Sequence, residues 1–291
     1  MFLCLFFTVL NYFGIRQSAL INNVLVAAKL GILAFFCIFG LLNVNPSNFM
    51  PFNPFQAGVL YGASYIFFAY GGFARVAVVA EEVKDAKRNV PKAMLLSLLL
   101  STIFYLAVGA VAVGLVGAKA LANSNSPLKD AISAAKSPFA EYLVSAGGLV
   151  ATASVLLTSI MGVSRMLYAM ARRKDLPQTL GKLHTRYNTP HHAVWIVGAM
   201  MILLVLAIDL TKVIAISTFA LLFYYAIANI SALKLKTAKR KYPKILPVIG
   251  AITCLSTLIF ILFVSPQSWI IGALSLLIGV TYYMIHNWRR R

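Results

Sequence analysis

The sequence predicts an all-α protein that crosses a lipid bilayer about eight times, and three observations support this prediction. Hydrophobic residues make up 60% of the 291 positions and charged residues only 11%, whereas a soluble domain uses about 25% charged residues. The apolar residues gather into blocks of spanning length, about 17–25 residues. Lys and Arg concentrate in alternate loops. These features indicate a single helical membrane domain over residues 1–291.

The predicted crossings are the apolar blocks themselves. Within hydrocarbon the backbone groups have no water to bond, so each block is expected to be a helix. A further apolar stretch, Phe2–Phe13, is too short to cross and is interpreted as part of a helix. The third crossing is expected to start after Asn89-Val90-Pro91, a cap residue followed by a proline in the first turn. The eight blocks are residues 18–42, 57–80, 93–117, 139–163, 193–208, 213–233, 245–264 and 268–285.

The net charge of +19 follows the predicted topology. Nineteen Lys and Arg residues fall in the segments on one side, which include 84–92, 172–186, 234–244 and the C-terminus, and four fall on the other. The positive-inside rule places the richer side and the C-terminus in the cytoplasm of a cell membrane. Anionic lipid is an expected partner of such loops, and nucleic acid is not.

Cysteine and histidine give no sign of a disulfide framework, a metal site or an enzyme. Cys4, Cys37 and Cys254 lie within apolar blocks, where a small hydrophobic residue is ordinary. The adjacent His191 and His192 could bind a metal, although an interfacial position near a helix start is the favoured interpretation. No catalytic residue, metal or cofactor is therefore expected.

Lys29 is the most informative single residue, because it is the twelfth residue of the block 18–42. A charge at that depth costs at least about 2.5–3.5 kcal/mol. An unpaired lysine reduces this cost by releasing its proton, which suits it to a proton relay. The alternative is a permanent structural role, with the lysine bonded to backbone carbonyls. All seven acidic residues lie at block ends or in loops: Glu81, Glu82, Asp85, Asp130, Glu141, Asp175 and Asp209.

A glycine pair interrupts the block 57–80 at Gly71 and Gly72. Glycines can break a spanning helix and turn its backbone groups toward a cavity. The neighbouring Phe67, Phe68 and Tyr70 could then contact the apolar part of a ligand. Close packing between helices, which small residues also permit, is an equal alternative.

Two hydroxyl residues, Ser154 and Thr158, are four positions apart and share one helix face. Both could point at one partner. The alternative is that each hydroxyl bonds the backbone of its own helix.

Three stretches resemble the amino acid–polyamine–organocation family of permeases. Residues 63–93, ASYIFFAYGGFARVAVVAEEVKDAKRNVPKA, are similar to that family's sixth helix and the loop after it. Residues 162–190, GVSRMLYAMARRKDLPQTLGKLHTRYNTP, resemble the end of its eighth helix and the following loop. Residues 11–40, NYFGIRQSALINNVLVAAKLGILAFFCIFG, resemble its fifth helix and the approach to it.

The resemblance implies a LeuT-like inverted-repeat fold. The eight blocks would be helices five to twelve and Phe2–Phe13 the end of helix four, so that the first three to four helices of the family are lacking. By resemblance, Phe67, Phe68, Tyr70, Gly71 and Gly72 form the helix-six half of the substrate site. Lys29 resembles a lysine of proton-coupled archaeal members, and Ser154 and Thr158 match a hydroxyl region near that coupling site. Many members carry Phe-Glu after the break, whereas this chain has Phe73-Ala74-Arg75.

The resemblance therefore implies secondary transport of amino acids, driven by a proton gradient without a cofactor. The family's first broken helix, which holds the charged ends of the substrate, has no counterpart in these residues. We expect the chain alone to be inactive and a second chain supplying helices one to four to be a partner. The alternative function is a non-transporting membrane subunit that associates with another permease.

Overall fold

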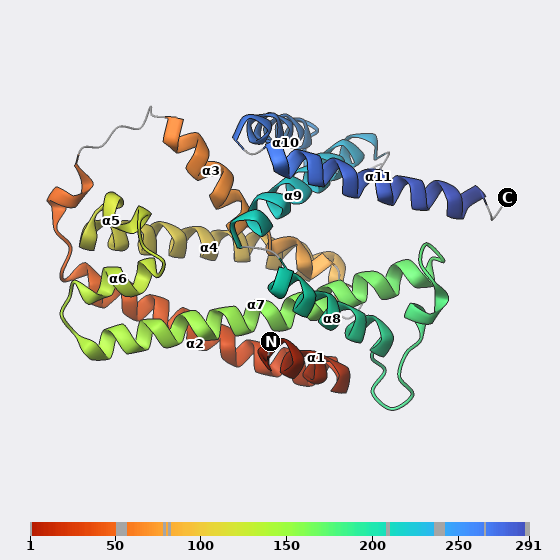
Figure 1. The fold of residues 1–291 in the computed structure, drawn as a ribbon, viewed down its shortest axis with the longest axis horizontal. Coiled ribbons are helices and arrows are strands. Elements are labelled where there is room, and N and C mark those ends of the chain that lie inside the picture. Colours follow the sequence, from red (N-terminus) through yellow and green to blue (C-terminus); the bar gives the residue numbers. More distant parts are fainter. Residues whose placement is uncertain are drawn as a thin grey trace. The chain divides into compact units, whose positions relative to one another are not determined.

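The computed structural model describes residues 2–50, 57–77, 80, 83–207, 210–235, 242–264 and 266–288 (Figure 1). Every regular element in these ranges is a helix, which confirms the predicted all-α class. The elements are α1 (Phe2–Phe13), α2 (Ile15–Leu41), η1 (Pro46–Phe49), α3 (Ala57–Ala69), η2 (Phe73–Ala77), α4 (Ala86–Val116), α5 (Ala118–Ala122), α6 (Pro127–Ser133), α7 (Pro138–Arg172), η4 (Gln178–Gly181), α8 (His191–Ala207), α9 (Leu210–Lys234), α10 (Ile245–Val264) and α11 (Pro266–Trp288).

Five stretches of these helices are long and apolar enough to cross a membrane. They are Ser18–Leu41, Ala86–Val116, Pro138–Arg172, Ile216–Lys234 and Ile245–Phe263. Phe2–Phe13, His191–Ala207 and Trp269–Ile285 are shorter apolar helices. The polytopic membrane character is thus confirmed, and the count of eight crossings stays a prediction.

Two boundaries differ from those expected. The block 57–80 is not one helix, because α3 ends at Ala69 and the short η2 begins at Phe73. Helix α4 begins at Ala86 and so contains Pro91, whereas a start after Asn89-Val90-Pro91 was predicted. The proline ring removes one hydrogen bond, to the carbonyl of Lys87. Pro91 is the sixth residue of α4 and lies beyond the first four N–H groups that need no helical partner, so this hydrogen bond is lost from the second turn of the helix.

The chain divides into two compact units, which are described separately. Unit 1 comprises Met1–Asn53 and Phe73–Val205. Unit 2 comprises Pro54–Gly72 and Leu206–Arg291. Helix α3 therefore belongs with the C-terminal helices, although it lies far from them in sequence.

Unit 1 is built on the antiparallel pair α2 and α7. The backbone of Gly147 lies so close to Ile32 that a methyl group on the glycine would stand 2.6 Å from Ile32 Cγ2. At the end where α2 and α4 finish, α6 and the start of α7 complete one apolar core around Phe36 and Ile132, both fully buried. A second core, around Phe7, Leu157 and Ile160, joins α1, α7 and α8.

Unit 2 has its own core on α9 and α10. It consists of Phe219, Leu222, Ala226, Cys254, Leu258 and Ile261. Trp269 of α11 closes one side of this core: its indole Nε1 donates to the Leu258 carbonyl at 2.9 Å, and its ring meets Phe219 edge-on.

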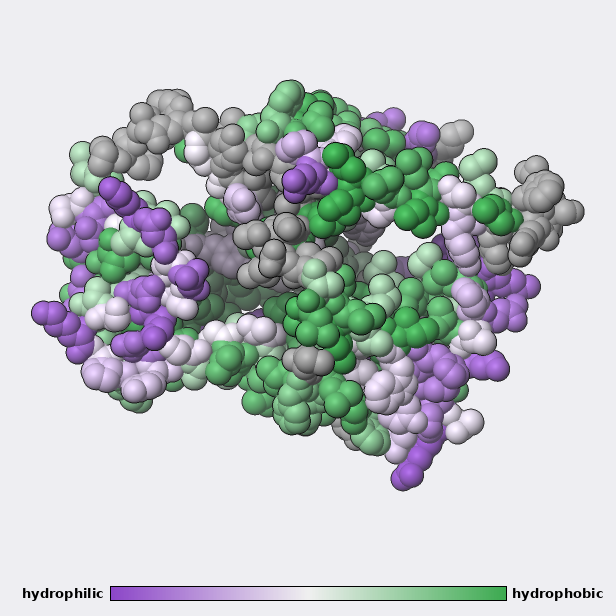
Figure 2. Space-filling view, in the orientation of Figure 1, coloured by the Kyte–Doolittle hydropathy of each residue, from purple (hydrophilic) through white to green (hydrophobic). Residues whose placement is uncertain are grey.

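Polar side chains gather at the two ends of unit 1. Figure 2 shows hydrophilic residues over α5 and α6 and over the segment that follows α7, with hydrophobic residues between them. Large apolar side chains such as Leu95, Leu99 and Ile103 of α4 are more than half exposed. Such a surface suits hydrocarbon, because apolar area in contact with water costs about 25 cal/mol per Å².

Candidate functional site

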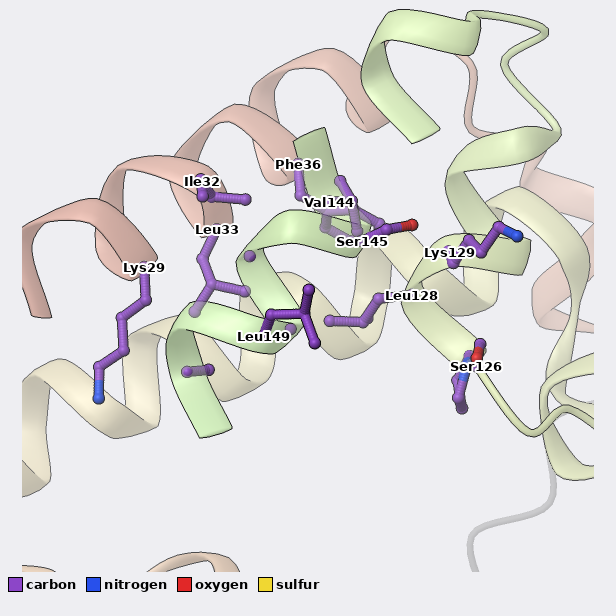
Figure 3. Close-up of a pocket in the computed structure, with 14 residues that line it drawn as sticks. Lys29, Ile32, Leu33, Phe36, Ser126, Leu128, Lys129, Val144, Ser145 and Leu149 are labelled. Atoms are coloured by element: carbon purple, nitrogen blue, oxygen red, sulfur yellow. The ribbon is translucent and has the colours of Figure 1, made fainter. Parts of the chain in front are cut away.

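Lys29 lines a cavity of about 570 Å³ within unit 1. Helix α2 contributes Lys29, Ile32, Leu33 and Phe36, and α7 contributes a face of mostly small and apolar residues from Val144 to Ala151. The short segment Ser126–Lys129 closes the other end. Figure 3 shows Lys29 and Lys129 at opposite ends of the site, with apolar side chains between them.

The two lysines have different electrostatic surroundings. The Nζ of Lys129 lies 3.3 Å from Glu141 Oε1. Among the described residues, no hydrogen bond or ion pair reaches the ammonium group of Lys29, which is half-buried. Of the seven acidic residues, Glu81, Glu82 and Asp209 lie outside the described residues. Within the described part of the chain, the cavity therefore has one lysine with a carboxylate partner and one lysine without.

Ser154 binds a residue that the sequence did not single out. Its Oγ donates to Asn22 Oδ1 of α2 at 2.8 Å, and the serine is 1% exposed. Asn22 lies seven residues before Lys29, about 10 Å or two turns along the same face of α2. The Ser154–Asn22 hydrogen bond thus fixes the register of α2 against α7, on the helix face that carries Lys29.

Thr158 bonds its own helix instead of a partner. Its Oγ1 donates to the carbonyls of Ser154 and Val155, at 2.9 and 3.1 Å. Along α7 it lies one further turn, about 6 Å, beyond Ser154 in the direction away from Lys29. The two hydroxyls therefore have different partners, and among the described residues neither forms a hydrogen bond with Lys29.

The helix break at the glycine pair is present, and the two glycines differ. The N–H of Tyr70 donates to Ile66 and Phe67, and that of Gly71 to Phe68 at 2.9 Å, so the helix tightens and stops. A methyl group on Gly71 would stand 2.6 Å from Leu221 Cδ1 of α9, whereas one on Gly72 would meet nothing within 4 Å. Gly71 serves close packing, and Gly72 stands where the helix is interrupted.

The aromatic residues before the break also contact α9. The ring of Phe67 meets Tyr225 edge-on at 6.0 Å between centroids. Phe68 is half-buried. Leu221 and Tyr225, which sequence reasoning did not single out, belong to an ordinary apolar block with no local signal.

The proposed site residues fall into two groups. Lys29, Ser154 and Thr158 lie in unit 1, and residues 67–72 lie in unit 2. The boundary between the units falls between Gly72 and Phe73, so the helix break coincides with the point where the chain passes from one unit to the other. Among the described residues, no group of three His, Cys, Asp or Glu side chains could hold a metal ion.

A polytopic membrane protein with a lysine in an apolar helix of spanning length and a second helix interrupted at glycines has the features of a membrane transporter. Comparison with known families agrees, because the amino acid permease family matches residues 1–285. The chain belongs to this family of permeases, which are transporters and not enzymes.

Several characterised and uncharacterised transporters are similar to the chain. An uncharacterized transporter of Mycobacterium tuberculosis is 34% identical over 284 residues, which cover 96% of this chain and 64% of that protein. A branched-chain amino acid permease of Bacillus subtilis is 28% identical over 96% of this chain and 62% of its own length. A methylthioribose transporter of the same organism is 27% identical, over 94% and 60% respectively. The chain thus spans less than two-thirds of the length of these relatives.

Proposed function

We propose that these residues form the later part of a secondary active transporter that moves amino acids across the cell membrane. The observation that carries the proposal is the interruption of α3 before Gly72, in a chain of the amino acid permease family. A broken helix offers unpaired backbone groups to the charged ends of a substrate near the middle of the bilayer. Phe67, Phe68 and Tyr70 precede the break and suit the apolar part of an amino acid.

We propose proton coupling through Lys29. Its half-buried ammonium group has no carboxylate partner among the described residues, which makes the neutral form accessible inside a membrane. The branched-chain permease relative supports amino acids as substrates. The methylthioribose relative makes a thioether-containing ribose a second candidate substrate.

We further propose that the 291 residues alone do not transport. In the inverted-repeat fold that the family resemblance implies, two broken helices form the binding site, and only one is found in the described residues. The cavity beside Lys29 is lined by mostly apolar residues of α2 and α7, which suits an apolar helix of a second polypeptide. The competing function is that of a non-transporting subunit.

Reconstitution into vesicles tests these proposals. Uptake of labelled leucine is measured under an imposed pH gradient, first with the 291-residue chain and then with a second chain resembling the family's first four helices. We expect uptake only in the presence of both chains. Robust uptake by the 291 residues alone would show that they need no partner, and no uptake with either preparation would favour the subunit. Inhibition of the labelled uptake by unlabelled methylthioribose, without inhibition by unlabelled leucine, would favour the second substrate class.

A further inference from the structure

The segment that joins α7 to α8, residues 172–192, is a folded turn at one end of unit 1. The N–H of Asp175 donates to the Met170 carbonyl at 2.9 Å, and that of His184 to Thr189 at 2.8 Å. The Thr189 hydroxyl donates to the Tyr12 carbonyl of α1, also at 2.8 Å. These bonds hold the turn against the helix ends, so its side chains stand in fixed positions on the surface.

This turn carries five exposed cationic side chains and one carboxylate. Asp175 forms an ion pair with Arg173, with 3.5 Å between Oδ2 and Nε. Neither Arg172 nor Arg186 pairs with an acidic side chain in the part of the chain that the structure describes. The cationic residues are Arg172, Arg173, Lys174, Lys182 and Arg186.

The two arginines without acidic partners are oriented by aromatic rings. The guanidinium carbon of Arg172 lies 5.8 Å from the ring centroid of Tyr168, and that of Arg186 lies 5.5 Å from Tyr187. Stacking on a ring leaves the N–H edges of a guanidinium group available in a planar fork. Such a fork matches two oxygens of a phosphate group.

Exposed apolar and aromatic side chains lie beside these cations. Trp195 and Leu183 are 44% and 43% exposed, and the Trp195 ring lies 6.2 Å from Tyr12. Phe13 and Tyr187 meet edge-on at 5.4 Å in the same aromatic cluster. Tryptophan and tyrosine are typical of the boundary between headgroups and acyl chains. Exposed apolar side chains would contribute nothing to the binding of free phosphate, whereas they can contact the acyl chains of a lipid.

We propose that this basic aromatic rim, formed by Arg172, Lys182, Arg186, Tyr187 and Trp195, binds anionic phospholipids. The phosphate groups pair with the cations and the upper acyl chains contact Trp195 and Leu183. Each cation near a negatively charged membrane surface strengthens binding roughly fivefold. The opposite end of unit 1 has fewer cations, and Lys129 there is already paired with Glu141. The proposal does not depend on transport and is measured without it.

Quenching of Trp195 by brominated lipids provides the test. The full chain and its Trp195→Phe variant are reconstituted in phosphatidylcholine, and their difference isolates the Trp195 signal. Phosphatidylglycerol or phosphatidylcholine, each brominated near the headgroup, is then added at equal fractions. We expect stronger quenching by the anionic lipid and a loss of that excess in 0.5 M NaCl.

Charge variants decide the interpretation. The triple variant Arg172→Gln/Lys182→Gln/Arg186→Gln should bind phosphatidylglycerol at least tenfold more weakly in apparent affinity. The excess quenching by the anionic lipid should be lost with it. The matched control Lys119→Gln/Lys136→Gln, at the opposite end of unit 1, should retain it. The variant Arg172→Lys/Arg186→Lys keeps the charges and should lie between the two, which separates lost charge from a misfolded turn. Equal quenching by both lipids would overturn the proposal, and so would removal of the excess by a few millimolar inorganic phosphate.

Discussion

At the scale of single residues, the cavity of unit 1 presents two lysines in contrasting surroundings. Lys129 is balanced by Glu141 at 3.3 Å. Lys29 is half-buried among Ile32, Leu33 and the small residues of α7. A charge in such a place is costly in a membrane, and the cost is reduced when the proton leaves. Substitution of Lys29 can therefore be compared with substitution of Lys129, a control in the same cavity.

We predict that Lys29→Ala abolishes proton-driven accumulation of substrate in an assembly that transports, while substrate binding survives. The change removes the titratable group but preserves the helix. Lys129→Ala should leave accumulation within about twofold, because an exposed pair such as Lys129–Glu141 contributes little. Accumulation is measured as uphill uptake under a pH gradient, and binding as equilibrium retention. Normal uphill uptake by Lys29→Ala would leave the lysine a structural role.

The sequence identified polar residues of the candidate site more readily than the residues to which they are hydrogen-bonded. Lys29 and Ser154 stand out because polar groups are costly in an apolar block. The partner of Ser154, Asn22, could not be identified, because the bond depends on the register of two helices separated by 132 positions. Thr158 shares the predicted face and still bonds its own backbone.

At the scale of elements, the interruption of α3 shows how two adjacent glycines can have different roles. Gly71 allows α3 to approach Leu221 of α9, and Gly72 has open space around it. The sequence pattern left helix breaking and close packing as equal alternatives. The structure assigns packing to Gly71, and that distinction depends on a neighbour about 150 positions away, which no local signal reveals.

We predict that Gly71→Ala destabilises the packing of α3 on α9, whereas Gly72→Ala is tolerated. The added methyl group on Gly71 would force Leu221 and the Phe68 carbonyl to shift, at a cost of about 1–3 kcal/mol typical of overpacking. Thermal unfolding in detergent, followed by helical circular dichroism, measures the difference. An equal loss of stability in both variants would show that the steric contact with Leu221 is not the cause.

Three histidine rings, those of His184, His191 and His192, lie close together in the turn between α7 and α8. The imidazole ring of His191 lies 4.0 Å from that of His192 and 5.5 Å from that of His184, and Tyr12 packs edge-on against both His184 and His191. Burial first, and then the neighbouring imidazoles of His192 and His184, hold the pKa of His191 below its ordinary value. The Nδ1 of His184 accepts from the N–H of Arg186 at 3.2 Å.

We predict that the turn loosens at acidic pH. The pKa of His191 is lowered in the fold, so the folded turn binds fewer protons than the unfolded one. The stabilisation is complete above the ordinary histidine value near 6.5 and is lost as the pH falls through the lower, folded value. Amide hydrogen exchange over residues 182–192, corrected for intrinsic rates, should show weaker protection at pH 5 than at pH 7.5, and His191→Gln should reduce this difference. The segment 123–137, which lacks histidine, is the internal control, and an equal change there would contradict the prediction.

At the scale of the whole molecule, the directions of the helices in unit 1 bring the cationic residues of separate loops to the same end. Helix α7 ends, and α4 and α8 begin, at the end that carries Lys84, Arg88, Arg172 and Arg186. Helices α2 and α4 finish at the opposite end, beside α5 and α6. By the positive-inside rule, we propose that the first of these ends faces the cytoplasm.

We predict that residue 124 faces outside and residue 237 faces the cytoplasm. Ser124→Cys and Thr237→Cys are made singly in a background lacking Cys4, Cys37 and Cys254. An impermeant thiol reagent should label position 124 in intact cells and position 237 only after the cells are opened. The reverse pattern would overturn the orientation. Position 237 lies outside the described residues, so its accessibility is an independent check.

Most of the helices could be predicted because length and hydropathy are local properties. Helix α10 (Ile245–Val264) has the predicted bounds, and α9 and α11 agree within a few residues. The division into two units could not be predicted, since it depends on which apolar faces meet. Nothing in the sequence of α3 indicates that it packs with α9.

The membership of α3 in unit 2 has a consequence for biosynthesis. Its packing partner α9 begins about 140 residues later in the chain. At about 5–20 residues per second, a ribosome needs on the order of 10–30 s to make that stretch. During this interval α3, 13 residues long and about 20 Å in length, has left the ribosome before its partner exists. The nascent chain therefore depends on the insertion machinery or on lipid to hold this short helix until α9 arrives.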